Sequence, residues 1–325
     1  MSAPDTPLQV RVARKHIEAD GVCSLELVPV SGNLPPFTAG AHIDVELPTH
    51  GGTLVRQYSL CNDPDGARHY QIAVLREAAS RGGSLAVHDG VAVGDLLQVG
   101  APRNHFPLAA DAPFHLLLAG GIGITPLMAM AEHLSHTPAP FALHVASRSR
   151  AHAPFLERIA GSSLAGHTQH YFGSGDGARR LDIDATLRAA PPGSHLYVCG
   201  PQRFIDAALD TAHAQGWPEA RLHREYFAAE PVTTAGDGGF ELEIASSGKV
   251  IAVLPQQTAL QALNDAGLDV PSSCEQGVCG TCLTGVKSGQ PEHRDLYLTD
   301  EEKAANDQFL PCCSRARSER LVLDL

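Results

Sequence analysis

The sequence predicts a multidomain protein, with an antiparallel β-barrel domain, then an α/β domain built on a parallel sheet, then a smaller α+β domain. Three changes of pattern along the 325 residues support this prediction. Short β-rich runs fill residues 1–106, and strands alternate with helices in residues 107–230. An aperiodic linker, residues 231–239, then precedes a last segment, residues 240–325.

The first segment contains six short β-rich runs separated by Gly, Pro, Asn and Asp residues. Such spacing is typical of a small antiparallel barrel. The expected strands are Val10–Val12, Ser24–Val28, Ala41–Leu47, Thr53–Leu60, Tyr70–Leu75 and Asp95–Val99.

The second segment opens on a continuous apolar strand that leads into a glycine-rich turn and a helix. Buried parallel strands have this unbroken apolar character, and alternation with helices indicates a parallel α/β domain. The expected strands are Phe114–Ala119, Phe141–Ala146 and His195–Cys199, and the expected helices are Leu127–Leu134 and Arg203–Gln215.

The last segment begins with a hairpin, Glu241–Ala245 and Val250–Leu254, followed by a helix. Thr258 and Gln261 have the spacing of a capping box at its start. Gly267 is suited to end the same helix.

Composition excludes several classes of function. The net charge of −12 argues against a nucleic-acid partner. No apolar stretch is long enough to span a bilayer, and Met1–Pro7 lacks the apolar region of a signal peptide. We therefore expect a cytoplasmic protein, monomeric and without a membrane partner.

Four cysteines in the last segment give the clearest indication of a functional site in this sequence. Cys274, Cys279 and Cys282 follow the spacing C-x4-C-x2-C, and Cys312 follows after 29 intervening residues, which is the plant-type [2Fe-2S] pattern. The intervening glycines would let the loop fold tightly around a cluster. A zinc site usually shows two C-x2-C pairs, and disulfides need an oxidising compartment, so both alternatives are weaker.

The ending PCCSRARSERLVLDL resembles the C-terminus of the family of phthalate dioxygenase reductases and vanillate O-demethylase oxidoreductases. In that pattern the ligand precedes a variable residue and Ser-Arg-Ala, which assigns the fourth ligand to Cys312 and leaves Cys313 as a packed neighbour. The resemblance also implies a β-grasp ferredoxin fold for residues 240–325.

Two motifs in the barrel segment, Arg56-Gln57-Tyr58-Ser59-Leu60 and Arg81-Gly82-Gly83-Ser84, are each weak alone. Together they resemble the flavin domain of the ferredoxin reductase superfamily. Arg56 and Ser84 would hold a phosphate, which Gly82 and Gly83 allow the backbone to approach. The remaining expected flavin contacts are Tyr58 beside the ring, Ser59 near its N5 edge, and the backbone of Ala73, Val74 and Leu75.

The position of the ferredoxin domain after the reductase domains resembles the FMN-dependent arrangement, so we expect FMN and not FAD.

The glycine-rich turn Gly120-Gly121-Ile122-Gly123 departs from the G-x-G-x-x-G fingerprint but would still bring a helix N-terminus to a pyrophosphate. Thr125 is expected to cap that helix, with Pro126 at its first position. By resemblance, Cys199, Gly200 and Pro201 lie where nicotinamide meets the flavin, and Phe227 covers the flavin face. Arg148 and Arg150 could hold a 2′-phosphate, although related NADH-dependent reductases also carry an Arg here, so NADH is favoured.

These resemblances imply an NADH-dependent iron–sulfur flavoprotein that passes electrons from NADH to FMN, to the [2Fe-2S] cluster, and then to a Rieske-type aromatic oxygenase or O-demethylase. Ser59, Cys199 and Phe227 are the residues expected at the reacting centre.

Residues 240–325 carry 13 Asp or Glu and 7 Lys or Arg, which indicates either solubility or an acidic docking face for the acceptor. Another acceptor, such as a cytochrome or an oxygenase of a non-aromatic methylated substrate, and a non-catalytic ferredoxin-type carrier are the alternatives.

Overall fold

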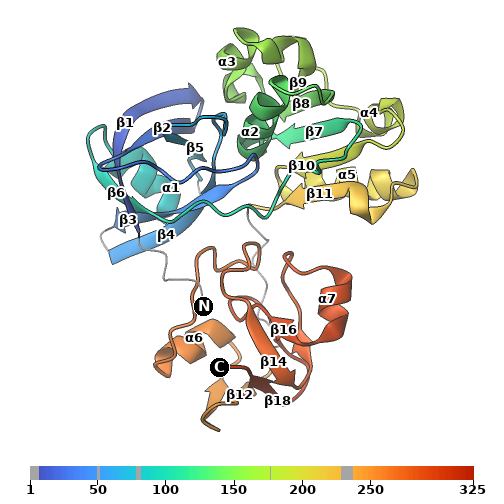
Figure 1. Cartoon of the computed structure of the whole chain (residues 1–325). Coiled ribbons are helices and arrows are strands. Elements are labelled where there is room, and N and C mark those ends of the chain that lie inside the picture. Colours follow the sequence, from blue (N-terminus) through green and yellow to red (C-terminus); the bar gives the residue numbers. More distant parts are fainter. Residues whose placement is uncertain (1–6, 50–51, 78–81, 176, 228–236) are drawn as a thin grey trace. The chain divides into compact units, whose positions relative to one another are not determined.

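The computed structural model describes residues 7–49, 52–77, 82–175, 177–227 and 237–325. These residues form two units, Met1–Glu225 and Tyr226–Leu325, and each unit is described by itself. Figure 1 shows the barrel and the α/β sheet of the first unit and the small sheet of the second.

Six antiparallel strands form the barrel, in the order β4-β3-β6-β1-β2-β5. A bridge between Leu60, just after β4, and Ile72 in β5 joins the two ends of the sheet. All six predicted strands are present, and β1 is much longer than expected. Their bounds are β1 Leu8–Ala19, β2 Val22–Pro29, β3 His42–Thr49, β4 Gly52–Ser59, β5 Tyr70–Leu75 and β6 Leu96–Val99.

Five parallel strands form the α/β sheet, in the order β11-β10-β7-β8-β9. The order reverses between β7 and β10, where doubly wound sheets bind ligands. The strands are β7 His115–Gly120, β8 Phe141–Ser147, β9 Thr168–Phe172, β10 His195–Cys199 and β11 Leu222–Glu225. The helices are α2 Ile124–Ser135, α3 Leu156–Ala160, α4 Ile183–Ala189 and α5 Gln202–Ala214.

One apolar core joins the barrel to the α/β sheet. It contains Val22 and Phe106 from the barrel segment together with Leu117, Met128 and Tyr197 from the α/β segment. The ring centroids of Phe106 and Tyr197 lie 5.9 Å apart. Because buried apolar contact is continuous across this seam, the two predicted domains form one structural unit.

The second unit has a mixed five-stranded sheet, in the order β13-β12-β18-β14-β16, in which only β12 and β18 are parallel. Both hydrogen bonds of the predicted capping box between Thr258 and Gln261 are present, and Gly267 follows the helix with φ +80°. The elements are β12 Phe240–Ile244, β13 Val250–Val253, α6 Ala259–Asp265, β14 Thr284–Ser288, β15 Pro291–Glu292, α7 Asp300–Ala305, β16 Gln308–Phe309, β17 Arg315–Ala316 and β18 Arg320–Leu323. None of the helices in the described ranges is long and apolar enough to cross a membrane.

Candidate functional site

The four cysteines of the predicted cluster lie together in the second unit as two pairs. Cys274 donates a hydrogen bond to Cys279, which lowers the pKa of the Cys279 thiol below its ordinary value. Cys282 pairs in the same way with Cys312, and this contact raises the pKa of Cys282. Among the described residues, no three His, Cys, Asp or Glu side chains gather as ligands of one ion. Two thiol pairs suit a two-iron cluster, with one pair for each iron, better than a single zinc ion.

Backbone N–H groups point at the cysteine sulfur atoms. The amide nitrogen of Gln276 lies 3.3 Å from the Cys274 Sγ, and that of Thr281 lies 3.5 Å from the Cys279 Sγ. Gly277 has φ +71°, and a Cβ there would collide with Cys313 and with Asp295 at 3.1 Å. These donors stabilise thiolates, so the loop fits the cluster that its spacing predicts.

Cys312 and its neighbour Cys313 have different surroundings. Cys312 is 5% exposed and contacts Cys282, whereas the Cys313 Sγ lies 3.8 Å from the Leu310 carbonyl oxygen. This arrangement is the one expected if Cys312 is the ligand and Cys313 packs beside it.

The two predicted flavin motifs meet in the barrel. A Cβ on Gly83 would lie 2.8 Å from the Arg56 Cγ, so the arginine stem packs directly on this glycine. Gly82 has φ +96°, a conformation that side-chain-bearing residues rarely adopt, and it precedes α1, Gly83–Leu85. The Ser84 Oγ accepts a hydrogen bond from the Glu77 N–H at 3.1 Å. Arg81, the first residue of the motif, lies outside the described residues.

β5 is the last strand of its sheet, so part of its backbone faces away from β2. The N–H of Cys61 donates to the Gln71 carbonyl on this outer side, and the N–H of Arg76 donates to Gly21 on the inner side. Backbone direction alternates along an antiparallel strand, so Ala73 and Leu75 face outward and Val74 faces inward. Of the three predicted backbone contacts, Ala73 and Leu75 lie on the outer side of β5. The Leu60–Ile72 bridge already pairs this side beside Ala73, and Leu75 lies beyond the bridge.

The predicted nicotinamide motifs also lie together. β7 and β10 are neighbours, with Ala119 opposite Cys199. A Cβ on Gly123 would collide with the Cys199 carbonyl, and one on Gly200 would lie 2.9 Å from the Gly120 Cα. The glycine turn and Cys199-Gly200-Pro201 therefore form one close-packed edge at the carboxyl ends of these strands.

The predicted helix cap at Thr125 is wrong. Helix α2 begins at Ile124, its N-cap is Gly123, and the Thr125 hydroxyl donates to the Ile122 carbonyl at 3.1 Å. Pro126 is accordingly the third helical residue and not the first. A 3-10 turn, Gly121–Gly123, leads directly into α2, so the helix starts earlier than its sequence signals indicate.

Glu225 is a candidate site residue that sequence reasoning missed. It ends β11, pairs in register with Cys199, and accepts a hydrogen bond from the Ser59 hydroxyl at 3.2 Å. Burial raises the pKa of Glu225 to about 8, and its charge adds to the burial that raises the pKa of Cys199. The hydrogen bond joins the last residue of β4 to the carboxyl edge of the α/β sheet. Only its place at the end of a short edge strand, before Tyr226 and Phe227, could have indicated it.

Three further predicted residues have simpler surroundings. Tyr58 packs against the barrel core, and burial raises the pKa of its phenol. Phe227, at the start of the second unit, is 38% exposed. Arg148, after β8, is also exposed.

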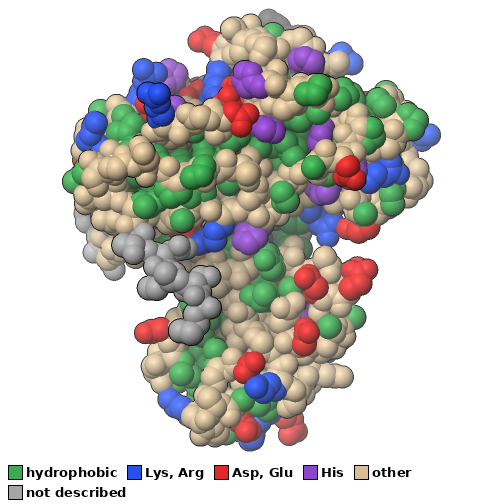
Figure 2. Space-filling model, viewed as in Figure 1, with side chains coloured by type: hydrophobic (Ala, Val, Ile, Leu, Met, Phe, Trp, Pro, Cys, Tyr) green, Lys and Arg blue, Asp and Glu red, His purple; other side chains and the backbone are tan. Residues whose placement is uncertain are grey.

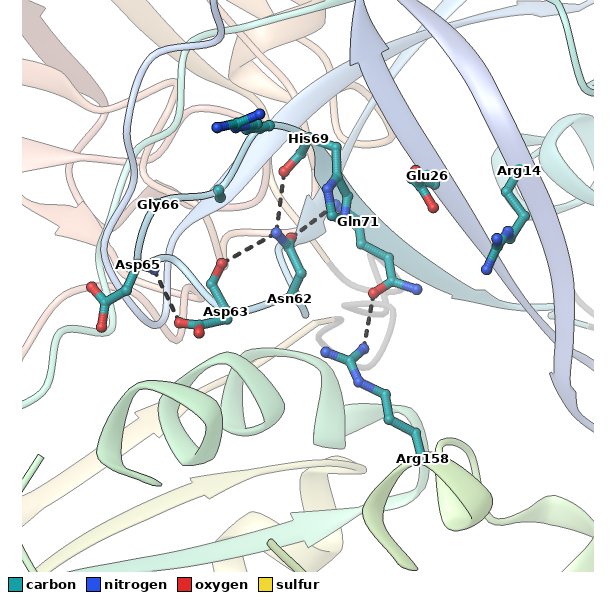
Figure 3. Close-up of a pocket in the computed structure, with 11 residues that line it drawn as sticks. Arg14, Glu26, Asn62, Asp63, Asp65, Gly66, His69, Gln71 and Arg158 are labelled. Atoms are coloured by element: carbon teal, nitrogen blue, oxygen red, sulfur yellow. Dashed lines mark hydrogen bonds between the residues drawn. The ribbon is translucent and has the colours of Figure 1, made fainter. Parts of the chain in front are cut away.

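A groove of about 590 Å³ opens at the seam between the barrel and the α/β sheet (Figure 3). Its wall includes Arg158, whose guanidinium donates to the Gln71 side chain at 2.9 Å and to Glu132 at 2.9 Å. None of the predicted flavin or nicotinamide residues lines it. The Arg158 contacts link α3 and α2 to β5, which is a structural role at the seam.

Comparison with known proteins agrees with this geometry. Residues 242–317 match the model of the 2Fe-2S iron-sulfur cluster binding domain. The chain is 50% identical over 319 residues to a vanillate O-demethylase oxidoreductase of Pseudomonas sp. (strain HR199 / DSM 7063), covering 98% of this chain and 100% of that one. It is 37% identical over 321 residues to phthalate dioxygenase reductase of Burkholderia cepacia, covering 98% and 97%.

A solved structure shares the fold over the same length. It is described as phthalate dioxygenase reductase, a modular structure for electron transfer from pyridine nucleotides to [2Fe-2S]. The TM-score is 0.75 at 36% identity, and the match covers 98% of each chain.

Proposed function

Because the chain belongs to the family of vanillate O-demethylase oxidoreductases and phthalate dioxygenase reductases, we propose that it is the NADH-dependent reductase component of a Rieske-type aromatic oxygenase or O-demethylase. It is an iron–sulfur flavoprotein oxidoreductase that moves electrons from pyridine nucleotide to a [2Fe-2S] centre. The proposal concerns which flavin and nucleotide it uses, which residues hold them, and which protein accepts the electrons.

We propose FMN as the flavin. Arg56, Gly82, Gly83 and Ser84 would hold its phosphate, since the arginine stem packs on Gly83 and the serine hydroxyl lies at the start of the same helical turn. Ala73 and Leu75 would hydrogen-bond the ring from the outer edge of β5. Bound there, FMN would supply hydride acceptance from the nicotinamide and single-electron release, which is the chemistry of the cofactor itself.

The observation that carries the proposal is the contact between Ser59 and Glu225. This hydrogen bond brings the flavin motif of the barrel to the edge that carries Gly120 and Cys199, where the nicotinamide would lie. Glu225 is largely protonated at neutral pH because burial raises its pKa to about 8. The pair therefore holds exchangeable protons beside the proposed reacting centre, and the packed glycine edge orients the nucleotide.

The proposed exit for electrons is the cluster loop of the second unit. Glu275 and Leu283 are exposed next to the ligands Cys274 and Cys282. The first turn of α7 adds Asp300, Glu301 and Glu302, and Figure 2 shows acidic side chains spread over the visible face of this unit. An exposed apolar residue beside the cluster loop, together with exposed carboxylates on the same unit, suits an acceptor that has a complementary basic surface.

Purified protein tests the proposal in three assays. Acid-released flavin should co-migrate with FMN on chromatography, and NADH should bleach the bound flavin much faster than NADPH. The reduced protein should then support turnover of a vanillate-type demethylase oxygenase. Recovery of FAD, or a preference for NADPH, would contradict the corresponding assignment. If a cytochrome were reduced efficiently and every Rieske oxygenase tested were not, the acceptor assignment would be wrong.

A further inference from the structure

The side chain of Lys15, on β1, contacts the carboxyl end of the helical segment Gly83–Gly90, about 70 residues further along the chain. Its Nζ donates to the carbonyl oxygens of Val87 at 2.8 Å, His88 at 2.8 Å and Val91 at 2.7 Å. An ammonium group has three N–H donors, so these bonds use all of them. Each is a charge-assisted bond. The carbonyls of Val87 and His88 belong to the last turn of the helical segment, which leaves them without a helical partner, and Val91 is the residue that caps its end.

The segment held by Lys15 begins at the proposed phosphate site. α1, Gly83–Leu85, continues without a break into a wider helical turn, Ala86–Gly90. Its first residue, Gly83, packs on the Arg56 side chain. A helix this short is not stable by itself in water, so tertiary contacts must fix its direction.

A second contact holds the same end of the segment. The Nε2 of His88 lies 2.9 Å from the Val74 carbonyl oxygen. A carbonyl only accepts, so this nitrogen carries the ring proton and donates it. Lys15 and His88 thus connect the segment to β1 and to β5, the strand whose outer edge would meet the flavin ring.

We propose that Lys15 is a positioning residue for the flavin phosphate. It fixes the segment Gly83–Gly90 so that Ser84 and the first N–H groups of the segment converge with the Arg56 guanidinium on one phosphate. This inference rests on the proposed FMN site, and Lys15 acts through the segment's carbonyl end. The expected consequence is selective: Lys15 should matter for a flavin with a phosphate and not for the same ring system without one.

The test compares FMN with riboflavin on the full-length protein after its flavin has been removed. Lys15→Met keeps the length of the side chain and removes its hydrogen bonds. We expect the Kd for FMN to rise about tenfold or more, since bonds to a charged donor are lost, and the Kd for riboflavin to stay unchanged. Arg11→Met is the matched control, because Arg11 is exposed on the same strand and loses the same charge. It should change neither Kd.

Three outcomes separate the inference from the proposal beneath it. If Arg56→Met weakens FMN selectively and Lys15→Met does not, the role of Lys15 is rejected and the FMN site stands. If Arg56→Met has no FMN-selective effect, the phosphate site itself is wrong. Equal weakening of both flavins by Lys15→Met means general damage to the barrel and also rejects the positioning role. Should that variant fail to fold, Lys15→Gln, which removes the charge and shortens the side chain, is titrated with the same two flavins and judged by the same criterion.

Discussion

At the scale of single residues, Glu225 shows how burial shifts the pKa of a carboxyl group at the proposed reacting centre. Its carboxyl pKa is raised to about 8, so the folded protein keeps a proton that the unfolded chain releases above about pH 4.5. Stability contributed by this group is therefore complete below pH 4.5 and is lost as the pH rises toward 8.

The first prediction concerns Glu225→Gln, which keeps the shape of the side chain and removes its titration. The thermal stability of the variant should exceed that of the wild type by a margin that grows between pH 6 and pH 9. The rate of flavin reduction by NADH should lose its inflection near pH 8. A wild-type profile that is flat across this range would show that Glu225 does not control the step.

The second prediction separates the adjacent cysteines. Cys312→Ser should abolish or badly damage the cluster, because Cys312 is the partner of Cys282. Cys313→Ser should retain it, because that thiol contacts the Leu310 carbonyl. Visible and EPR spectra of the two purified variants decide the matter, and a normal spectrum from Cys312→Ser would overturn the ligand assignment.

At the scale of elements, three buried or half-buried histidines lie on neighbouring strands of the α/β sheet. His115 on β7 pairs in register with His195 on β10, and the His195 Nδ1 lies 3.0 Å from the His223 Nε2 on β11. Burial lowers the pKa of His115 and His223 to about 4 and also lowers that of His195. The fold therefore favours the neutral forms.

The third prediction follows from the sign of these shifts. A histidine whose folded pKa is depressed contributes stability above pH 6.5 that is lost as the pH falls toward 4. The melting temperature of the first unit should accordingly fall steeply between these values. His223→Phe keeps a ring beside Tyr197 and removes one titrating group, so its loss on acidification should be smaller. His213→Gln, on α5, removes an exposed ion pair with Glu219, so it should change this profile far less than His223→Phe does.

Elements with strong local signals were predictable, and those that depend on their neighbours were not. The six barrel strands, β10 and the capping box at Thr258 match the sequence pattern. β9 and β11 were missed because edge strands are covered on one side only and have no unbroken apolar run. The same limit applies to the site. Cysteine spacing identifies the proposed cluster ligands, but the Ser59–Glu225 bond joins residues 166 positions apart and needs the fold to form.

At the scale of the whole molecule, chemistry divides between two units. The first unit has its own core and carries both the proposed flavin site and the proposed nicotinamide site. The second carries the cysteine loop and a net charge of −6 on residues 240–325.

The fourth prediction uses this division. A chain ended within residues 231–239 should keep its FMN and reduce ferricyanide with NADH at the wild-type rate. It should fail to support the oxygenase, because electrons reach the acceptor through the cluster of the second unit, which the truncated chain lacks.

If the acidic surface guides docking, turnover by the full-length protein should fall as salt rises, since exposed charges are screened beyond about 10 Å at 0.1 M. A salt-independent association rate would reject the docking role and leave the electron path intact.

Anaerobic mixing with NADH tests the central claim most directly, with the flavin followed by its absorbance and the cluster by its EPR signal. In the full-length protein the flavin should bleach first and the signal of a reduced [2Fe-2S] cluster should follow. In protein stripped of flavin, NADH should leave the cluster oxidised, and added FMN should restore its reduction. Reduction of the cluster by NADH at an unchanged rate without flavin would contradict the account, as would a bleached flavin beside a cluster that stays oxidised.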